Sequence, residues 1–284
     1  MATVNFDHAP AATDSSLLSK WMTSLHARLI AAGWTIEYAD SDAIGGGSAG
    51  TPAWDKSAAN NTDAGVAVYR MPANGGLTRW FVRLRPGWAG NVVRPHMRGI
   101  TIGNTHNGSG TVTGPGGEIV AGTVAIATNS VEFMTAASED GFLVFLNAGS
   151  NSVLAHVERI RLRSGVQDEL LAINKYSTGD LYNVVSEASV TPNVPLLFLN
   201  PQRMNLSALN VASHSPYLDS NIELGPYTAF GDPLTLPPRL WRMVTPAAFP
   251  AGSTYELDID GGLKMYRVAD STLVLSGAIA VATE

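Results

Sequence analysis

Short apolar runs separated by turn residues dominate the middle of the chain, from residue 66 to residue 164. Apolar and polar residues alternate in several of these runs, which is typical of strands with one buried face. Two runs, VAVYRM and LTRWFVRLR, flank the sequence PANGG, and an Asn-Gly step between two β-runs is the strongest short-range hairpin signal. The turn clusters SEDG (138–141) and GSNS (149–152) separate later runs. Antiparallel β-structure is therefore predicted for this part of the chain.

One earlier segment has the period of a helix. Its apolar residues recur at spacings of three and four, at Leu18, Trp21, Leu25 and Leu29. Gly33 stands where a glycine that ends a helix is expected. We therefore expect a mainly β fold with one N-terminal amphipathic helix, formally α+β, in which residues 1–165 form an antiparallel β-sandwich-like domain.

Residues 190–250 differ in character, because they contain 10 of the 16 prolines and show no clear period. Large apolar side chains are scattered among the prolines, including Phe198, Tyr217, Tyr227, Phe230 and Trp241. The segment is too apolar to be a disordered linker, and an irregular segment of this kind often lies across another surface. We expect a second region, 166–284, with this irregular proline-rich segment, a hairpin that turns at Gly261–Gly262 and a terminal strand.

The composition narrows the functional classes. The chain has 284 residues, no cysteine and a net charge of −6, so disulfides and thiolate metal sites are excluded. Charged residues make up only 15%, against about 25% in a usual soluble domain. This suits a β-rich subunit whose surface is largely covered by partners. No apolar run is long enough for a membrane span and no signal peptide is visible, so we expect assembly in a cytoplasm.

Arginine is concentrated in one part of the chain. Residues 70–163 carry nine Arg and no Lys against five acidic residues, whereas residues 164–284 carry six basic and 12 acidic residues. Arg is favoured over Lys where planar contacts are fixed in place, which indicates interfaces. The interface candidates on strand faces are Arg79, Phe81, Arg83 and Arg85 in one run and Arg159, Arg161 and Arg163 in another. The aromatic residues of the proline-rich segment complete the set.

Two alternatives stay open for the arginine-rich run. In the first, its guanidinium groups pair with acidic residues of another segment or of another subunit. Alternatively, Arg side chains together with Trp80, Phe81 and Trp88 bind single-stranded nucleic acid by stacking and charge. The acidic balance of the whole chain makes the nucleic-acid hypothesis the weaker one.

Motifs that suggest chemistry lack their required context. The G-x-S-x-G match at 46–50 has no strand before it and no helix after it. The sequence GNTHNGSGTVTGPGG lacks the lysine and spacing of a phosphate loop, so a glycine-permitted β-turn region is predicted. Asp258–Gly261 lacks further calcium ligands and is predicted to be a strand end with a turn. The histidines form no local metal pair, although His96 and His106 could meet across a turn. We predict no catalytic residue, no cofactor and no metal site.

A family likeness covers about residues 15–165. Met97–Thr105 (MRGITIGNT) and Asn107–Gly114 (NGSGTVTG), followed by SEDG at 138–141 and Val157–Arg159 (VER), fit a recurring pattern. In this pattern the chain resembles virion structural proteins of tailed bacteriophages. The resemblance implies a particle component that assembles with copies of itself and with other virion proteins, and it implies no catalytic residues.

The leading expectation is thus a homo-oligomeric tail, baseplate, fibre or capsid-decorating subunit located in the virion. An alternative is a receptor- or carbohydrate-binding module of a tail fibre, in which exposed aromatics such as Trp54, Trp88 and Tyr217 stack on a host-surface glycan. A third option, an enzyme that cleaves such a glycan, would need a carboxylate pair in a cleft, and the sequence shows no local sign of one.

Overall fold

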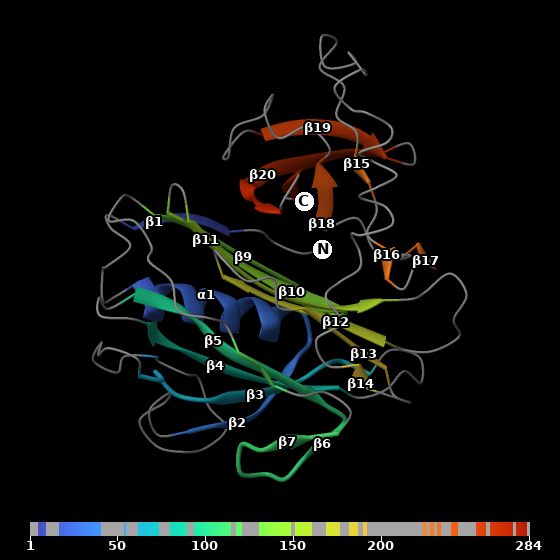
Figure 1. Ribbon diagram of the computed structural model, residues 1–284. Coiled ribbons are helices and arrows are strands. Elements are labelled where there is room, and N and C mark those ends of the chain that lie inside the picture. The colour runs from blue at the N-terminus through green and yellow to red at the C-terminus, as the bar shows by residue number, and fades with distance from the viewer. Residues whose placement is uncertain are drawn as a thin grey trace. The chain divides into compact units, whose positions relative to one another are not determined.

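The computed structural model divides the chain into two compact units, Met1–Arg159 with Asp168–Asn193 and Ile160–Gln167 with Val194–Glu284 (Figure 1). The structure describes the backbone of residues 5–9, 17–40, 54, 62–73, 80–89, 94–114, 118–120, 131–148, 151–160, 169–176, 182–186, 190–191, 224–225, 228–229, 232–233, 240–243, 254–259, 262–274 and 277–282. It describes side chains at 17–40, 54, 62–73, 80–88, 96–114, 118, 133, 135–144 and 155–159. The predicted boundary at 165 lies outside these ranges.

The first unit contains two large sheets, here called sheet 1 and sheet 2. Sheet 1 has seven strands in the order β1 (Asn5–Ala9), β9 (Val131–Ser138), β10 (Gly141–Ala148), β11 (Asn151–Ile160), β12 (Glu169–Tyr176), β13 (Tyr182–Ser186) and β14 (Val190–Thr191). Sheet 2 has five, in the order β2 (Thr35–Ala39), β3 (Ala67–Arg70), β4 (Phe81–Ala89), β5 (Arg94–Gly103) and β8 (Glu118–Val120). Every pairing whose register is described is antiparallel. The prediction of a mainly β, antiparallel fold is therefore confirmed.

The predicted turns set the connections within these sheets. Strands β3 and β4 pair as the expected hairpin, with Arg70 opposite Phe81. Strands β9 and β10 pair from Ser138 opposite Gly141, so the SEDG cluster forms the two-residue turn between them. Strand β1 adds to the edge of sheet 1 beside β9, a long-range pairing that no local pattern predicted.

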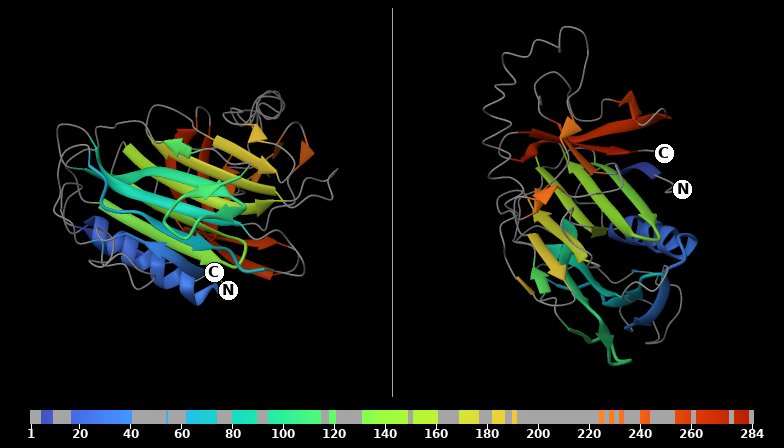
Figure 2. Two further views of the ribbon diagram at one scale, coloured as in Figure 1. Left: turned by 90° about the horizontal axis from the view of Figure 1, so that it is seen from below. Right: turned by 90° about the vertical axis from the view of Figure 1, so that its right-hand side faces the viewer.

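The helix α1 (Leu17–Ala31) packs against both sheets. Its buried residues cover about half of its circumference and are Leu17, Leu18, Trp21, Met22, Leu25, His26 and Leu29. At one edge of this buried face of the helix, Ser24 Oγ lies 2.6 Å from Thr135 Oγ1 of β9 in sheet 1. At the other, His26 Nδ1 lies 2.9 Å from the Tyr69 hydroxyl of β3 in sheet 2. Figure 1 shows the helix between β9 and β10 above it and β4 and β5 below it, and Figure 2 shows that it runs along one side of the two sheets.

Gly33 ends the helix as predicted. It has φ of +87°, a left-handed conformation that costs glycine little. The Trp34 N–H donates to the Leu29 carbonyl at 2.9 Å and the Gly33 N–H to the Ile30 carbonyl at 3.0 Å, which is the Schellman arrangement. The chain turns there directly into β2. The Trp34 indole N–H then donates to the Ser138 carbonyl at 2.6 Å, which ties the start of β2 to the β9–β10 turn of sheet 1.

Five tryptophans anchor the core of the first unit. They are Trp21, Trp34, Trp54, Trp80 and Trp88, and each is at most 3% exposed. They belong to one apolar cluster that also contains Phe133 of β9, Phe142 of β10 and Val157 of β11. Burial of a large side chain contributes about 2–3 kcal/mol to stability. The helix and both sheets therefore share one continuous core.

The second unit contains a five-stranded sheet in the order β15 (Leu224–Gly225), β18 (Leu240–Met243), β21 (Gly277–Ala282), β20 (Gly262–Val274) and β19 (Thr254–Ile259). A separate pair is formed by β16 (Thr228–Ala229) and β17 (Asp232–Pro233). Ile259 pairs with Gly262, so the predicted hairpin is present, and Gly262 belongs to β20 and not to the turn. Most of the predicted irregular segment, including residues 192–223, lies outside the described residues.

Among the described residues, no helix combines the length and the hydropathy that a bilayer crossing requires.

Candidate functional site

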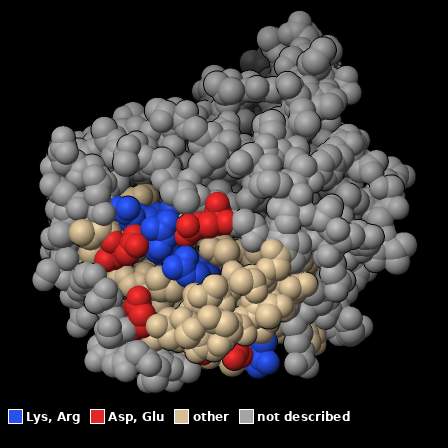
Figure 3. Space-filling view, turned by 60° about the horizontal axis from the view of Figure 1, so that its bottom comes forward, with Lys and Arg blue, Asp and Glu red and all other residues tan. Residues whose placement is uncertain are grey.

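The outer face of sheet 2 carries the arginine side chains that the sequence singled out. Along β4, Val82 and Leu84 are fully buried in the core, whereas Arg83 and Arg85 alternate with them and are partly exposed. We call the five side chains that meet here, Asp63, Arg83, Arg85, Arg98 and Glu118, the charged face. Figure 3 shows basic and acidic side chains gathered together on this side of the described surface.

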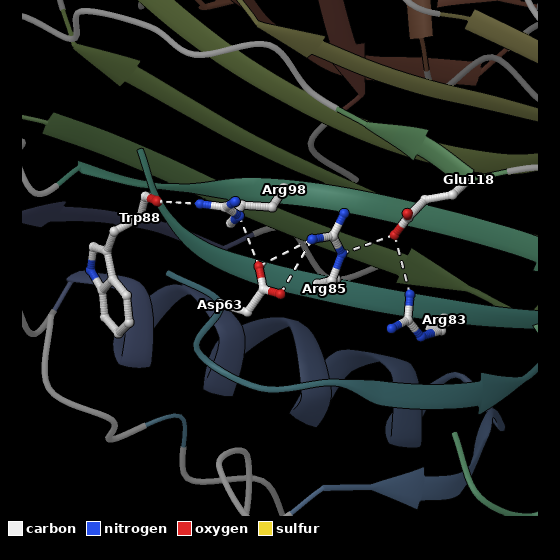
Figure 4. Close-up of polar contacts among 6 residues, drawn as sticks. All are labelled: Asp63, Arg83, Arg85, Trp88, Arg98 and Glu118. Carbon is white, nitrogen blue, oxygen red and sulfur yellow. Dashed lines mark hydrogen bonds and ion pairs between the residues drawn. The ribbon is translucent and has the colours of Figure 1, made fainter. Parts of the chain in front are cut away.

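The charged face is a continuous chain of ion pairs (Figure 4). Glu118 Oε1 accepts from Arg83 Nη1 at 3.2 Å and from Arg85 Nε at 2.9 Å. Arg85 Nη1 also lies 3.2 Å from both Asp63 carboxylate oxygens. Asp63 Oδ1 lies 2.8 Å from Arg98 Nε. Arg98 Nη1 in turn donates to the Trp88 carbonyl at 2.8 Å. Each carboxylate thus joins two guanidinium groups that lie on the strands.

Strand register explains how Arg85 reaches Glu118. Arg85 is opposite Gly99 on β5, and Glu118 of β8 is opposite Thr101 on the far side of β5. The contact therefore runs diagonally across Gly99. A Cβ at this position would lie 2.5 Å from Glu118 Oε1 and 3.1 Å from Arg85 Nε. The absence of a side chain at residue 99 lets the ion pair lie flat against the sheet.

Asp63 is positioned by a short backbone bridge to β4. The Ala64 N–H donates to the Pro86 carbonyl at 2.8 Å, and the Trp88 N–H donates to the Thr62 carbonyl at 2.9 Å. Asp63 bridges to Gly87 between these two bonds. A Cβ on Gly87 would lie 2.3 Å from the Thr62 carbonyl oxygen. The bridge therefore requires glycine at 87, because any side chain would push the aspartate segment away from the sheet.

The electrostatics of the charged face favour the ionised guanidinium of Arg85. Burial opposes its charge, but the hydrogen bonds and charges of Glu118 and Asp63 outweigh burial and raise the pKa of Arg85. The charged side chains are between 17% and 38% exposed. A single pair at such exposure stabilises a fold by about 0–1 kcal/mol. A linked network with fixed geometry is more effective, because its members share the entropic cost of ordering.

A second group of contacts holds the β6 (Thr105–His106) and β7 (Val112–Thr113) hairpin at the Phe81 end of the same sheet. We call Tyr38, Phe81, His106 and this hairpin the hairpin cluster. The His106 ring lies 5.7 Å from the Phe81 ring and 6.4 Å from the Tyr38 ring, measured between centroids. Gly110 lies directly against the Tyr38 ring, since a Cβ on it would be 2.5 Å away. The hairpin is thus seated on aromatic side chains of β2 and β4.

The turn of this hairpin is closed by side-chain acceptors. Asn107 Oδ1 accepts from the Ser109 N–H at 2.9 Å and from the Thr111 N–H at 3.0 Å. His106 Nε2 accepts from the Gly110 N–H at 3.2 Å, so the neutral ring is required. Burial lowers the pKa of His106, and the charge of Glu37 partly opposes this effect. The prediction of a glycine-permitted β-turn region is confirmed here.

Arg159, another predicted interface residue, is only 6% exposed. Its Nη2 donates to the Pro72 carbonyl at 3.0 Å, and its backbone N–H donates to the Asp140 carbonyl at 2.7 Å. The first contact links β11 of sheet 1 to the segment that follows β3 in sheet 2, and the second links β11 to the β9–β10 turn within sheet 1. Arg159 therefore has hydrogen-bond partners within its own chain.

Nearby on β11, His156 Nε2 lies 3.1 Å from Glu158 Oε2, and both side chains are at most 2% exposed. Their geometry does not form a hydrogen bond. The two residues are an ion pair only if the histidine is protonated.

The remaining predicted interface residues are Arg79, Arg161, Arg163, Phe198, Tyr217, Tyr227 and Phe230, which lie outside the described residues, and Trp241, of which only the backbone in β18 is described. Within the described ranges, no three His, Asp or Glu side chains come together as a metal-binding group.

Two aromatic residues that the glycan alternative required are buried. Trp54 and Trp88 are each 1% exposed and lie in the core, so the expectation that their rings are exposed for sugar stacking is wrong. Trp88 is an even number of residues from Val82 and Leu84, so strict alternation through Pro86 could have placed it in the core. Trp80 is likewise fully buried, which removes two of the three rings that the nucleic-acid hypothesis used.

Sequence reasoning missed the acidic partners of the arginines. Asp63 belongs to a bridging segment with no strand pattern, and Glu118 opens a strand of only three residues. Sequence reasoning also missed the contact of Tyr38 in β2 with His106, because nothing in the local sequence indicates that these two residues meet. In comparisons with known proteins, the chain matches no family model and no curated protein sequence.

Proposed function

We propose that the chain is a structural subunit of a tailed-bacteriophage particle, in the tail, baseplate, fibre or capsid-decorating set. It acts through symmetric assembly with copies of itself and with other virion proteins, and its place is the virion. The phage assignment is supported by the sequence resemblance. The segments that carry this resemblance correspond to β5, the β6–β7 hairpin, the β9–β10 turn and the end of β11.

The charged face of sheet 2 is the observation that supports a role in assembly. Its side chains are already held against the sheet by one another. Docking a partner on such a face orders few additional rotamers, and the loss of side-chain freedom is one of the main costs of association. A preorganised, half-buried pattern of charge also defines which partner surface fits, because like charges brought together are strongly unfavourable.

We further propose that sheets 1 and 2 are the two layers of a β-sandwich-like domain. The single core that takes in α1 and both sheets supports this arrangement. In the second region, the proline-rich segment would dock on neighbouring copies or other virion proteins through the aromatic residues predicted from the sequence. The structural scaffold and the docking segment would thus belong to different parts of the chain.

Mass spectrometry of gradient-purified particles tests the assignment. The chain should be present at a fixed copy ratio to the major particle proteins and should stay bound after washing. Sedimentation velocity of the purified protein should show oligomers that grow with concentration. A protein that is monomeric at every concentration and absent from washed particles would overturn the proposal.

A further inference from the structure

The charged face has an uncompensated positive charge. Three guanidinium groups share two carboxylates, and each of Glu118 and Asp63 is bound by two arginines. The neighbouring pair of Arg70 and Glu37, at 2.9 Å, adds no net charge. The face as a whole therefore has a formal charge of +1.

The excess charge lies toward Arg83, at one end of the network. Arg85 contacts both carboxylates, and Arg98 contacts Asp63 and the Trp88 carbonyl. Arg83 makes one contact, from Nη1 to Glu118 at 3.2 Å, and its side chain is 24% exposed. Among the described residues, no partner is found for its Nε and Nη2 groups. A carboxylate from outside could bind this guanidinium without displacing Glu118, because an arginine has five donors.

The last part of the chain, residues 164–284, has the opposite charge. Residues 70–163 contain nine arginines and five acidic residues, a balance of +4, whereas residues 164–284 contain six basic and 12 acidic residues, a balance of −6. The two parts of one polypeptide are therefore complementary in charge. Two copies of the chain can satisfy this complementarity only if unlike parts meet.

Symmetry then decides between two kinds of contact. A two-fold contact whose axis passes through the charged face would place one charged face against another and bring the two Arg83 groups together. A head-to-tail contact pairs different patches and closes into a ring when the rotation allows it. We infer that the charged face of one copy binds acidic side chains from residues 164–284 of the next copy, either head-to-tail or in a two-fold contact whose axis lies away from the charged face. This inference rests on the proposed function and names the surface through which assembly occurs.

Sedimentation velocity of charge variants tests the surface. Arg83→Glu should raise the dissociation constant between copies at least about tenfold. Arg83→Gln should give a smaller effect in the same direction, and it avoids the repulsion from Glu118 that could disturb folding. Lys20→Glu, on the exposed side of α1, makes the same change of charge elsewhere and should leave association unchanged. Wild-type association should also weaken as salt rises from about 0.1 M to about 1 M.

A photo-crosslink tests which part of the second copy the charged face contacts. The chain has no cysteine, so Thr101→Cys gives one attachment site beside Arg83 and Glu118 for a benzophenone maleimide. Copies labelled with heavy nitrogen are mixed with unlabelled copies, and only mixed-isotope crosslinks are counted. Crosslinked peptides should come from residues 164–284. Peptides from residues 62–118 of the second copy would show a face-to-face contact and overturn the inference.

The outcomes separate this inference from the proposed function. If the chain is found in particles and forms oligomers, but Arg83→Glu behaves like Lys20→Glu, the charged face is not the docking surface and the particle role stands. A chain that is found in particles but does not bind itself also overturns the inference alone. Absence from particles together with a monomeric state overturns both.

Discussion

The two ends of the outer face of sheet 2 are held by different forces. On β4, β5 and β8, Arg83, Arg85 and Arg98 are fixed by two carboxylates in a chain of ion pairs. At the other end the β6–β7 hairpin is seated on the Tyr38 and Phe81 rings, and its own His106 accepts a hydrogen bond from the Gly110 N–H. Salt weakens the first arrangement because it screens charge. Acid weakens the second because a protonated ring no longer accepts from Gly110. One surface therefore contains two parts that can be perturbed separately.

The largest effect is expected from a change that separates Asp63 from the network. In Gly87→Ala, the new methyl group would lie 2.3 Å from the Thr62 carbonyl oxygen, which is backbone and cannot rotate away. The bridging segment must shift and withdraw Asp63 from Arg85 and Arg98. We expect the free energy of unfolding, measured with urea, to fall by about 2–3 kcal/mol. Gly108→Ala, in the hairpin turn, meets no atom within 4 Å and should cost only about 1 kcal/mol, through its positive φ. Equal losses would contradict the steric account.

A smaller effect is expected when the central guanidinium is removed. Arg85→Met leaves Asp63 and Glu118 with one arginine each, and we expect a loss of about 1–2 kcal/mol at low salt. Arg83→Met removes a single ion-pair contact and should cost less. The difference between the two variants should shrink in urea titrations at about 1 M salt. A larger loss for Arg83→Met would show that the network is not centred on Arg85.

The hairpin cluster should respond to acid instead. In the unfolded chain His106 has a pKa of about 6.5, and burial lowers its pKa in the folded state. The unfolded chain therefore binds the proton first as pH falls. The contribution of His106 to stability is complete above about pH 6.5 and is lost as pH falls from there toward the lowered pKa of the folded state. Hydrogen exchange at residues 107–111, corrected for intrinsic rates, should accelerate in this window and should not depend on salt.

His106→Gln separates this effect from that of His26, whose pKa is also lowered by burial. The glutamine side chain does not titrate and offers an amide oxygen as an acceptor for the Gly110 N–H. In the variant, hydrogen exchange at the hairpin should no longer depend on acid. Exchange in α1 near His26, which contacts the Tyr69 hydroxyl, should still depend on acid. Unchanged exchange in the variant would place the titrating group elsewhere.

The smallest effect is expected for an isolated pair on the same sheet. Arg70 Nε and Glu37 Oε1 lie 2.9 Å apart, with side chains 35% and 28% exposed. Arg70→Gln should change the free energy of unfolding by about 0.5 kcal/mol or less. A loss as large as that of Arg85→Met would mean that linking the pairs into a network adds little.

Features set by neighbouring residues could be predicted from the sequence. The stripe that includes Leu25 and Leu29 placed α1, and Gly33 placed its end. The PANGG and SEDG segments placed two hairpins. In each case a backbone preference and a hydrophobic period act within a few residues, so no knowledge of distant segments is needed.

Features set by distant segments could not be predicted. The pairing of β1 with β9 joins residues more than a hundred positions apart. The pairing of Arg85 with Asp63 depends on a bridge that only the missing side chain of Gly87 permits. The glycan alternative assumed that Trp88 is exposed, yet β4 continues through Pro86 to Ala89 and the Trp88 ring is buried. Local pattern indicated that arginines share a face but not which carboxylates they meet.

The placement of tryptophan has a practical use in spectroscopy. Five of the six tryptophans lie in the core of the first unit. Intrinsic fluorescence of the chain will therefore report chiefly on unfolding of that core, with a smaller contribution from Trp241 in the second unit. If far-ultraviolet circular dichroism changes before the tryptophan emission shifts to the red, the two units unfold in separate steps.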